Sequence, residues 1–350
     1  MSRRVRGVLA LTGACAVACI IASVDVTVSA QGKGEPPKAA ARPSVPGTPD
    51  GRPDLSGVWS FATATPLERP QELGGKAVLS DEEIAQLERR AAQQSTAERR
   101  PPSGDTGSYN VFWTDAGAKR TDRRTSLISD PPDGRLPSVT PETQKRMLAL
   151  MTAESDPNEP EDLTPWGRCI TGFNAGPPIL PSGYNNNLQV MQSRDTVMLV
   201  TEMVHEARPV PLDGRPHLPP AVRQWQGDSR GRWDGGTLVI DTTNFRKEGT
   251  GNLPLLGAGV GGRLRAGVLT DENLHVVERL SRPDAGTLRY EVTVADPTVW
   301  TRPWTAVVLM QKADEGIYEY ACHEGNYAIG NILTGKRAQE RATAGGSGIK

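Results

Sequence analysis

The sequence predicts a mainly β protein: an antiparallel meander that closes into a barrel or sandwich, with two or three short helices and long Pro/Gly-rich loops. From Asn187 onward, apolar and polar residues alternate in segments that start roughly every 10–12 residues, as in such folds. The chain of 350 residues contains 37 glycines and 29 prolines, which supply many turns. Helical and strand patterns do not alternate along the chain, which disfavours a parallel sheet.

Tight turns separate the alternating segments and set the limits of the expected strands. The turn residues are Ser193-Arg194-Asp195, Asp234-Gly235-Gly236 and residues 283–286. The first strand is expected at Gly57-Val58-Trp59. Later strands are expected at residues 188–192, 196–203, 237–243, 274–280, 287–294, 305–311 and 317–322, with one more at Trp233.

Two helices are expected in an insertion over residues 79–155, after the first strand. Ser80 and Glu83 form a capping box, in which the serine hydroxyl and the glutamate carboxylate satisfy free backbone N–H groups. Thr140 is the expected N-cap of the second helix, and Pro141 stands at its first position, where a missing N–H costs nothing. The insertion belongs to a single β-rich domain over residues 54–345.

The first thirty residues have the pattern of a secretory signal peptide. Three arginines precede an apolar run over residues 8–22, and Val28-Ser29-Ala30 offers small residues for cleavage after Ala30. The run is shorter than the roughly 20 residues that span a bilayer, which disfavours a membrane anchor. A twin-arginine signal and a lipoprotein signal stay open as export routes. We expect a periplasmic or extracellular protein with a flexible linker over residues 31–53.

The charge of the chain indicates the class of partner. The formal net charge is −1, and loss of residues 1–30, with three arginines and Asp25, makes it −3. Such a chain has no large positive field that would attract nucleic acid or anionic lipid. We expect a small-molecule ligand or substrate, no nucleic acid, and no stable membrane insertion after signal cleavage.

Cleavage would also remove Cys15 and Cys19 and leave two cysteines, Cys169 and Cys322. Two thiols in an oxidising compartment usually pair, so the sequence predicts a disulfide between them. The alternative is a catalytic Cys322 beside His323, which requires an exported thiol to stay reduced.

Gly57-Val58-Trp59 is similar to the Gly-x-Trp that opens lipocalin-type (calycin) barrels. In that family the tryptophan closes one end of the barrel and stacks under an arginine from a late strand. The resemblance therefore implies a lipocalin-like barrel in which Arg302 is the partner of Trp59. It covers only these residues, and the helical insertion and the length of the chain depart from the lipocalin pattern.

Five stretches of the mature chain resemble an uncharacterised family of exported bacterial proteins. They begin at Arg124, Tyr184, Pro211, Gly227 and Tyr320, so the resemblance extends over most of the chain. It implies export and one shared fold, and it implies no particular activity.

Histidine is scarce, and three of its four positions lie at strand ends or in loops, where functional groups collect on rigid scaffolds. A barrel mouth built from such loops would gather three imidazoles with carboxylates for acid–base chemistry. The candidate catalytic residues are His217, His323, His205, Asp228, Glu202 and Glu319. Glu202 and Glu319 are expected within strands, where alternation can turn them into the barrel and raise their pKa by burial.

Two other residues on strands bear on this site. Asp241 is a further carboxylate with a claim to proton transfer. His275 lies inside an alternating strand and is expected to face solvent or to be satisfied by a neighbour. We therefore leave His275 out of the candidate catalytic set.

Arginines are concentrated between residues 208 and 232, and their planar guanidinium groups match carboxylates two bonds at a time. They suggest a clamp for an anionic group, beside aromatic and amide side chains. The candidate substrate-binding residues are Arg223, Arg215, Arg230, Trp225, Asn186 and Tyr184. The alternative is that these arginines pair with carboxylates of the protein itself along a Pro-rich loop.

The spacing of histidines and cysteines does not favour a metal, and no cofactor is expected. The sequence contains no His-x-His, His-Glu-x-x-His or Cys-x-x-Cys. Glycines between residues 257 and 262 follow no strand and open no periodic helix, so they indicate a mobile loop rather than a nucleotide site.

Three functions fit these patterns. The first is an exported enzyme that uses acid–base chemistry, of the lyase, isomerase or hydrolase type, on a small oxygenated substrate, neutral or anionic, at a barrel mouth. The second is a lipocalin-like protein that binds a small molecule without changing it. The third is a structural or interaction protein of the envelope. An enzyme predicts histidines and carboxylates within hydrogen-bond distance, a carrier predicts an apolar lumen, and an interaction protein predicts no deep pocket.

Overall fold

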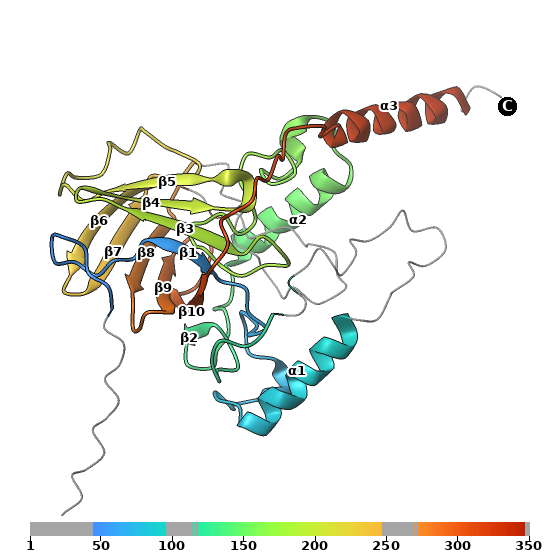
Figure 1. Cartoon of the computed structure of the whole chain (residues 1–350). Coiled ribbons are helices and arrows are strands. Elements are labelled where there is room, and N and C mark those ends of the chain that lie inside the picture. Colours follow the sequence, from blue (N-terminus) through green and yellow to red (C-terminus); the bar gives the residue numbers. More distant parts are fainter. Residues whose placement is uncertain (1–44, 96–114, 116–117, 247–269, 271, 347–350) are drawn as a thin grey trace, which may run out of the picture. The chain divides into compact units, whose positions relative to one another are not determined.

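The computed structural model describes residues 45–95, 115, 118–246, 270 and 272–346 (Figure 1). The expected signal peptide, residues 31–44 of the expected linker, and the glycines between 257 and 262 lie outside these residues. The described part of the linker is folded into a turn, because Thr48 N–H donates to Arg52 O at 2.8 Å and Gly47 bridges Pro53.

One antiparallel sheet dominates the described part of the chain and confirms the prediction of a mainly β fold (Figure 1). Along the sheet the strands follow the order β5-β4-β3-β1-β10-β9-β8-β7-β6, and β2 pairs with β10. The strands are β1 (Gly57–Ser60), β2 (Ile128–Asp130), β3 (Asn187–Gln192), β4 (Thr196–Thr201), β5 (Ala207–Pro211), β6 (Asp228–Asp234), β7 (Thr237–Thr243), β8 (His275–Ser281), β9 (Thr287–Ala295) and β10 (Trp304–Ala313).

The sheet consists of two meanders, β3–β5 and β6–β10, joined by β1, which pairs with both β3 and β10. Its two edge strands, β5 and β6, meet through side chains. Arg208 Nη1 donates to Ser229 Oγ at 3.2 Å. A Cβ atom on Gly231 would lie 2.5 Å from Leu212, so only glycine lets the two strands approach this closely. No backbone ladder joins β5 to β6 among the described residues, and a closed barrel is therefore not confirmed.

Three α-helices are described, α1 (Asp81–Ser95), α2 (Pro141–Ser155) and α3 (Ala328–Gly346). Both predicted helix starts are confirmed. Ser80 N–H donates to the Glu83 carboxylate at 2.7 Å and Glu83 N–H donates to Ser80 Oγ at 3.3 Å, which is a capping box. Thr140 Oγ1 accepts from Thr143 N–H at 3.2 Å in front of Pro141. No described helix is long and apolar enough to cross a membrane.

Three single-turn helices lie within the described residues: η1 (Gln71–Leu73), η3 (Pro160–Asp162) and η4 (Met203–His205). Only η4 is close to predicted site residues. It follows β4 directly and carries Val204 and His205 at φ 53° and 49°, in the left-handed region. These values are uncommon for residues other than glycine, and least expected for a β-branched one.

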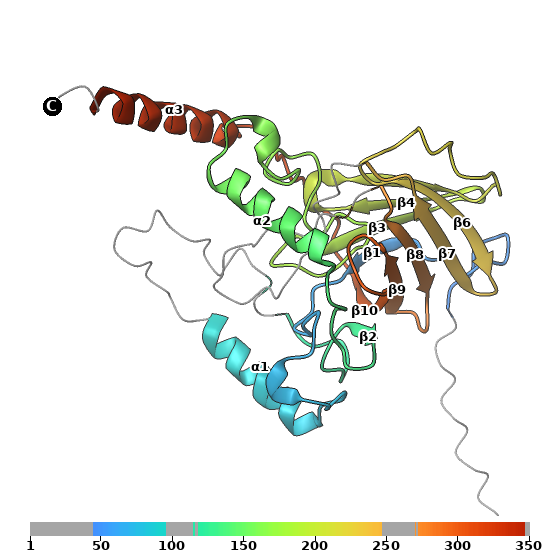
Figure 2. The ribbon, with the colours of Figure 1, turned by 180° about the vertical axis from the view of Figure 1, so that it is seen from behind.

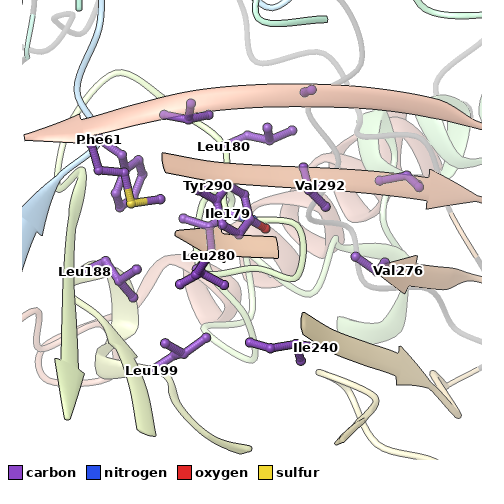
Figure 3. Packing of buried hydrophobic residues seen from close by; sticks show 14 of the residues in the cluster. Phe61, Ile179, Leu180, Leu188, Leu199, Ile240, Val276, Leu280, Tyr290 and Val292 are labelled. Atoms are coloured by element: carbon purple, nitrogen blue, oxygen red, sulfur yellow. The ribbon is translucent and has the colours of Figure 1, made fainter. Parts of the chain in front are cut away.

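The inner face of the sheet is filled by the hydrophobic core, in which Leu188, Leu280, Tyr290 and Val292 are fully or almost fully buried (Figure 3). A segment between α2 and β3, residues 174–181, adds to this core. Ile179 is buried in it and donates its backbone N–H to Tyr290 Oη at 3.0 Å. The space that a carrier would keep for a ligand is thus occupied by the protein's own side chains.

Two expectations about the contacts and strands of the fold are wrong. The partner of Trp59 is Arg282, whose guanidinium lies 5.1 Å from the tryptophan ring centroid, whereas Arg302 pairs with Asp130 at 2.9 Å. Arg282 reaches this position because it follows β8 directly and donates to Asp54 O at 2.5 Å, just before β1.

The second error is the strand expected at residues 317–322. This segment is extended and pairs with no strand. Two of its backbone N–H groups donate instead to side chains, from Tyr318 to Glu202 and from Tyr320 to His205. Sequence alternation cannot distinguish these acceptors from the carbonyl groups of a neighbouring strand.

Candidate functional site

His217, in the loop between β5 and β6, lies between two carboxylates. Its Nδ1 is 3.0 Å from Asp228 Oδ2, and its Nε2 is 3.0 Å from Asp241 Oδ1. The second oxygen of Asp241, Oδ2, lies 3.1 Å from His275 Nε2. We call this unbroken chain of Asp228, His217, Asp241 and His275 the relay.

Three neighbouring strands position the relay. Asp228 opens β6, Asp241 lies near the end of β7, and His275 opens β8, and β7 pairs with both other strands (Figure 2). Successive side chains of a strand point to opposite faces of a sheet. Because Thr242 and Val276 are fully buried in the core, the side chains next to them, those of Asp241 and His275, lie on the outer face.

The inner end of the relay is fixed and charge-balanced. Asp228 is 4% exposed, and its Oδ2 accepts from Leu218 N–H at 2.9 Å. Its other oxygen pairs with Arg230 Nη2 at 2.9 Å, and Arg230 Nε also donates to Pro216 O at 3.0 Å. These bonds hold the loop that carries His217 onto β6.

The two histidines have different roles in this geometry. A carboxylate only accepts, so both contacts of His217 are satisfied together when both ring nitrogens carry a proton. His275 uses Nε2 for Asp241, and its Nδ1 has no hydrogen-bond partner among the described residues. The side chain of His275 is 44% exposed. The relay therefore ends in a ring nitrogen that can exchange a proton with a bound molecule.

The pKa values of Asp241 and His275 are shifted in opposite directions, as expected of an ion pair. The hydrogen bond from His275 lowers the pKa of Asp241 from 3.8, although partial burial opposes the shift. The hydrogen bond to Asp241 raises the pKa of His275 from 6.5, again against partial burial. His275 thus holds a proton to higher pH than an isolated imidazole.

The His275–Asp241 contact is expected to stabilise the fold in a limited pH window. A raised histidine pKa gives stability that is complete below 6.5 and is lost as the pH rises through the higher folded value. A lowered aspartate pKa gives stability that is present above 3.8 and is lost as the pH falls through the lower folded value. His275→Gln should therefore cost most between these limits, about 0.3–1 kcal/mol because the pair is exposed.

Urea unfolding of wild type and His275→Gln tests this at about pH 5.5 and about pH 8.5, on either side of the histidine's ordinary range. We expect the difference in unfolding free energy to be larger at the lower pH. An equal difference at both pH values would contradict the coupling of His275 to Asp241.

A second polar cluster surrounds Glu202, which follows β4 and is 4% exposed. Its two oxygens accept from Asn185 Nδ2 at 2.6 Å and from Asn187 Nδ2 at 2.9 Å. Tyr318 N–H adds a third donor at 3.3 Å. Nearby, His205 Nδ1 accepts from Tyr320 N–H at 3.0 Å. Two asparagines of the run over residues 185–187 thus supply donors to a buried carboxylate.

The predicted catalytic residues fall into separate environments. Asp228 and His217 meet in the relay, whereas Glu202 and His205 belong to the second cluster. Glu319 is exposed on the extended segment, so the expectation that it lies in a strand and points into a barrel is wrong.

His323 is exposed beside a disulfide, formed as predicted between Cys169 and Cys322 with an S–S distance of 2.02 Å. This bond removes the alternative of a free, reactive Cys322. His205 and His217 are bonded to different parts of the chain, and no hydrogen bond among the described residues joins either ring to His323.

Most of the arginines between residues 208 and 232 pair with carboxylates of the protein, as the alternative to a substrate clamp predicts. The pairs are Arg208–Glu278, Arg215–Asp213, Arg223–Glu272 and Arg230–Asp228. Trp225 lies under Arg246, with the guanidinium 4.7 Å from its ring centroid. The sequence shows that arginines are concentrated in this segment, but it does not indicate which carboxylates or aromatic rings they contact.

The two other predicted binding residues support the loop before β3. Asn186 is 2% exposed and its amide bonds Asp115, Ser182 and Asn174. Tyr184 packs edge-on against Phe173 with ring centroids 5.3 Å apart. Both side chains therefore have partners in the protein that explain their positions.

His275 is the functional candidate that sequence reasoning missed. Its strand position gave only the weak expectation of a neighbour, and that neighbour is Asp241, 34 residues earlier in the chain. A signal was nevertheless present. With β7 and β8 as antiparallel neighbours, outward positions near the end of one strand and the start of the next come close together.

No group of three or more histidine, cysteine, aspartate or glutamate side chains in the described residues is arranged to hold a metal ion. In the relay, each carboxylate is used by a histidine instead. A groove of about 430 Å³ lies elsewhere, between the end of α2 and α3, and is lined by Asp156, Lys336, Gln339, Glu340, Thr343 and Ala344. No family model, curated protein or solved structure matches the chain.

Proposed function

We propose that the protein is an exported enzyme that uses acid–base chemistry, of the lyase, isomerase or hydrolase type, and that the relay is its proton-transfer site. The observation that carries this proposal is the unbroken chain from buried Asp228 to exposed His275, whose Nδ1 has no hydrogen-bond partner in the described part of the chain. A base whose orientation is fixed by a carboxylate is the usual arrangement for general acid–base catalysis.

His275 is the group that takes a proton from the substrate or returns it, through Nδ1. Asp241 bonds the opposite nitrogen, sets the ring orientation and stabilises the imidazolium once it forms. His217 and Asp228 hold Asp241 from behind, and Arg230 balances the charge of Asp228. His217, Asp228 and Arg230 are positioning residues, because they act through Asp241.

The charges of the relay favour a small oxygenated substrate that is, or becomes, anionic. Protonation of His275 adds a positive charge beside the reacting molecule, and this charge attracts a developing oxyanion. A ligand carrier fits less well, because the inner face of the sheet is packed with Tyr290, Ile179 and their apolar neighbours (Figure 3).

Export and lipocalin-like closure belong to the same proposal. The Cys169–Cys322 disulfide supports an oxidising compartment. Trp59 stacked under Arg282, and the side-chain contacts between β5 and β6, support a lipocalin-type origin for the sheet. The envelope structural protein remains the alternative that an inactive relay would favour.

Turnover and proton exchange measure the proposed activity. Purified protein is incubated in D2O with hydroxy acids, keto acids and uronates, and deuterium incorporation and product are followed by NMR. We expect one of these classes to react, and His275→Ala to lower the rate by about 10²–10⁴-fold, the usual worth of a general acid or base.

His323→Ala is the matched control, since it removes an exposed imidazole that lies outside the relay. It should keep the wild-type rate. Loss of activity in His323→Ala with full activity in His275→Ala would overturn the assignment to the relay. If none of the hydroxy acids, keto acids and uronates reacts, the enzymatic proposal is overturned for these three classes.

A further inference from the structure

An extended segment over residues 314–327, here called the strap, joins β10 to α3 and covers the second polar cluster. Tyr318 N–H donates to Glu202 Oε2 at 3.3 Å, and Tyr320 N–H donates to His205 Nδ1 at 3.0 Å. Two residues further, Cys322 is bonded to Cys169. Alternate residues of the strap are thus attached by two hydrogen bonds and then by one covalent bond.

The Tyr320 contact depends on the protonation state of His205. A backbone N–H is only a donor, so Nδ1 must offer its lone pair and the ring must be neutral with its proton on Nε2. When the ring becomes an imidazolium, Nδ1 also carries a proton. Two donors would then face each other across 3.0 Å, and the contact cannot persist.

The other titratable groups here are carboxylates or lie on the strap. Glu202 and Glu206 belong to the same turn as His205, Glu319, His323 and Glu324 lie on the strap, and Asp115 acts on Glu202 through space. Burial raises the pKa of Glu206, against the attraction of Arg208. Glu202 keeps Asn185 and Asn187 as donors whether or not the strap is bound. Of these groups, His205 is the one whose protonation removes the strap contact from Tyr320.

The backbone beneath the strap is held in an uncommon conformation. Val204 and His205 both have positive φ, and Asn185, which bonds Glu202 from the other side, has φ 54°. Such conformations persist where surrounding contacts enforce them. One of those contacts is the bond from Tyr320.

We propose that the strap is a pH-released cover over the Glu202 cluster. At neutral or alkaline pH, neutral His205 binds Tyr320 N–H and the strap is closed. On acidification, His205 takes up a proton, the Tyr320 and Tyr318 contacts are lost, and the Glu202 carboxylate with its two asparagine amides becomes accessible. The Cys169–Cys322 disulfide keeps the released strap tethered, so that it closes again when the pH rises.

Hydrogen exchange followed by mass spectrometry tests this on the full mature protein from about pH 8 to about pH 5, where histidines titrate. The matched variant is His205→Asn. Asparagine offers an oxygen acceptor near the position of Nδ1, does not titrate, and tolerates positive φ better than most residues. The peptide over residues 317–322 is identical in both proteins, so its intrinsic exchange rates cancel in their ratio.

We expect the wild-type to His205→Asn ratio of exchange rates to be near one at the alkaline end and to rise by up to about tenfold for each pH unit once His205 is protonated, as one linked proton requires. His323→Asn, on the strap itself, should behave as wild type. A wild-type to His205→Asn ratio that does not change between the alkaline and the acidic end overturns the proposal. The proposal is also overturned if His323→Asn abolishes the increase in exchange on acidification.

Imidazole nitrogen NMR of the wild-type protein gives a measurement that needs no variant to fold. At the alkaline end, the signals of His205 should show the tautomer with its proton on Nε2. A proton on Nδ1 at this pH would exclude the bond from Tyr320 and overturn the proposal as well.

Discussion

Replacing Glu278 with alanine is expected to lower the free energy of unfolding by about 3–5 kcal/mol, because it leaves a buried arginine without its counter-ion. Glu278 is fully buried on the core face of β8, and Arg208 on β5 is 5% exposed. Their pairing is bidentate, at 2.6 and 2.7 Å, and Tyr290 Oη donates to the same carboxylate at 2.8 Å. Urea unfolding at neutral pH measures the loss.

The pKa directions agree with a strongly coupled buried group. Burial opposes the charge of Arg208, but Glu278 attracts it more strongly, so the pKa of Arg208 is above its ordinary value. Burial and the neighbouring charge of Glu278 both raise the pKa of Tyr290 well above 10.0. The charged arginine and the neutral phenol are therefore the forms that the folded core accepts.

The double variant Arg208→Met with Glu278→Leu separates the cost of an unpaired charge from the worth of the pair. Replacing a buried ion pair by apolar residues of similar volume is often neutral or stabilising. We expect the double variant to recover most of the stability lost in Glu278→Ala, less the cost of the Tyr290 hydroxyl that no longer donates. A single variant within 1 kcal/mol of wild type, about the effect of a surface change, would contradict this account.

The sheet was predictable because its physics is local. Strands β4, β8 and β9 have alternating burial along their whole length and β3 along its first four residues, and alternation is what a sequence displays. The helix starts at Ser80 and Thr140 were equally readable, because a cap needs only residues within one turn. The disulfide was predictable from the expected compartment and the number of cysteines.

What the sequence did not reveal depends on contacts between distant segments. β5 lies in the arginine-rich stretch, for which the sequence predicts a loop. Arg208 occupies a buried position of this strand, where an alternating pattern would have an apolar residue. Its partner Glu278 interrupts the apolar face of β8 in the same way. A charged residue alone argues against burial, and Arg208 and Glu278 can be buried only because each pairs with the other.

The same limit applies to the candidate site. Asp228 and His217 were in the candidate set because they are polar residues near strand ends, whereas His275 was not, because its use depends on Asp241 from the neighbouring strand. Arg282 replaced Arg302 over Trp59 for a similar reason: either arginine is compatible with the motif, and the path of the chain after β8 decides between them.

Removing the disulfide is the second large expected effect. Cys169 and Cys322 are 153 residues apart, and the loop they close contains eight of the ten described strands, β3 to β10. In the chain-entropy model a loop of this length restricts the unfolded chain by roughly 5 kcal/mol. The variant Cys169→Ser with Cys322→Ser should therefore lose up to about this amount of unfolding free energy.

Serine is the matched replacement for two reasons. Cys169 has φ 57°, and serine carries the same backbone cost there as cysteine does, so the comparison leaves strain unchanged. Serine can also keep the contact that Asn326 Nδ2 makes with Cys169 Sγ at 3.1 Å. If the bond acts on the unfolded chain, the variant should also show a steeper dependence of unfolding free energy on urea, because a chain without the cross-link exposes more surface. A loss below 1 kcal/mol with an unchanged urea dependence would contradict the entropic account and leave the disulfide with only its role as tether of the strap.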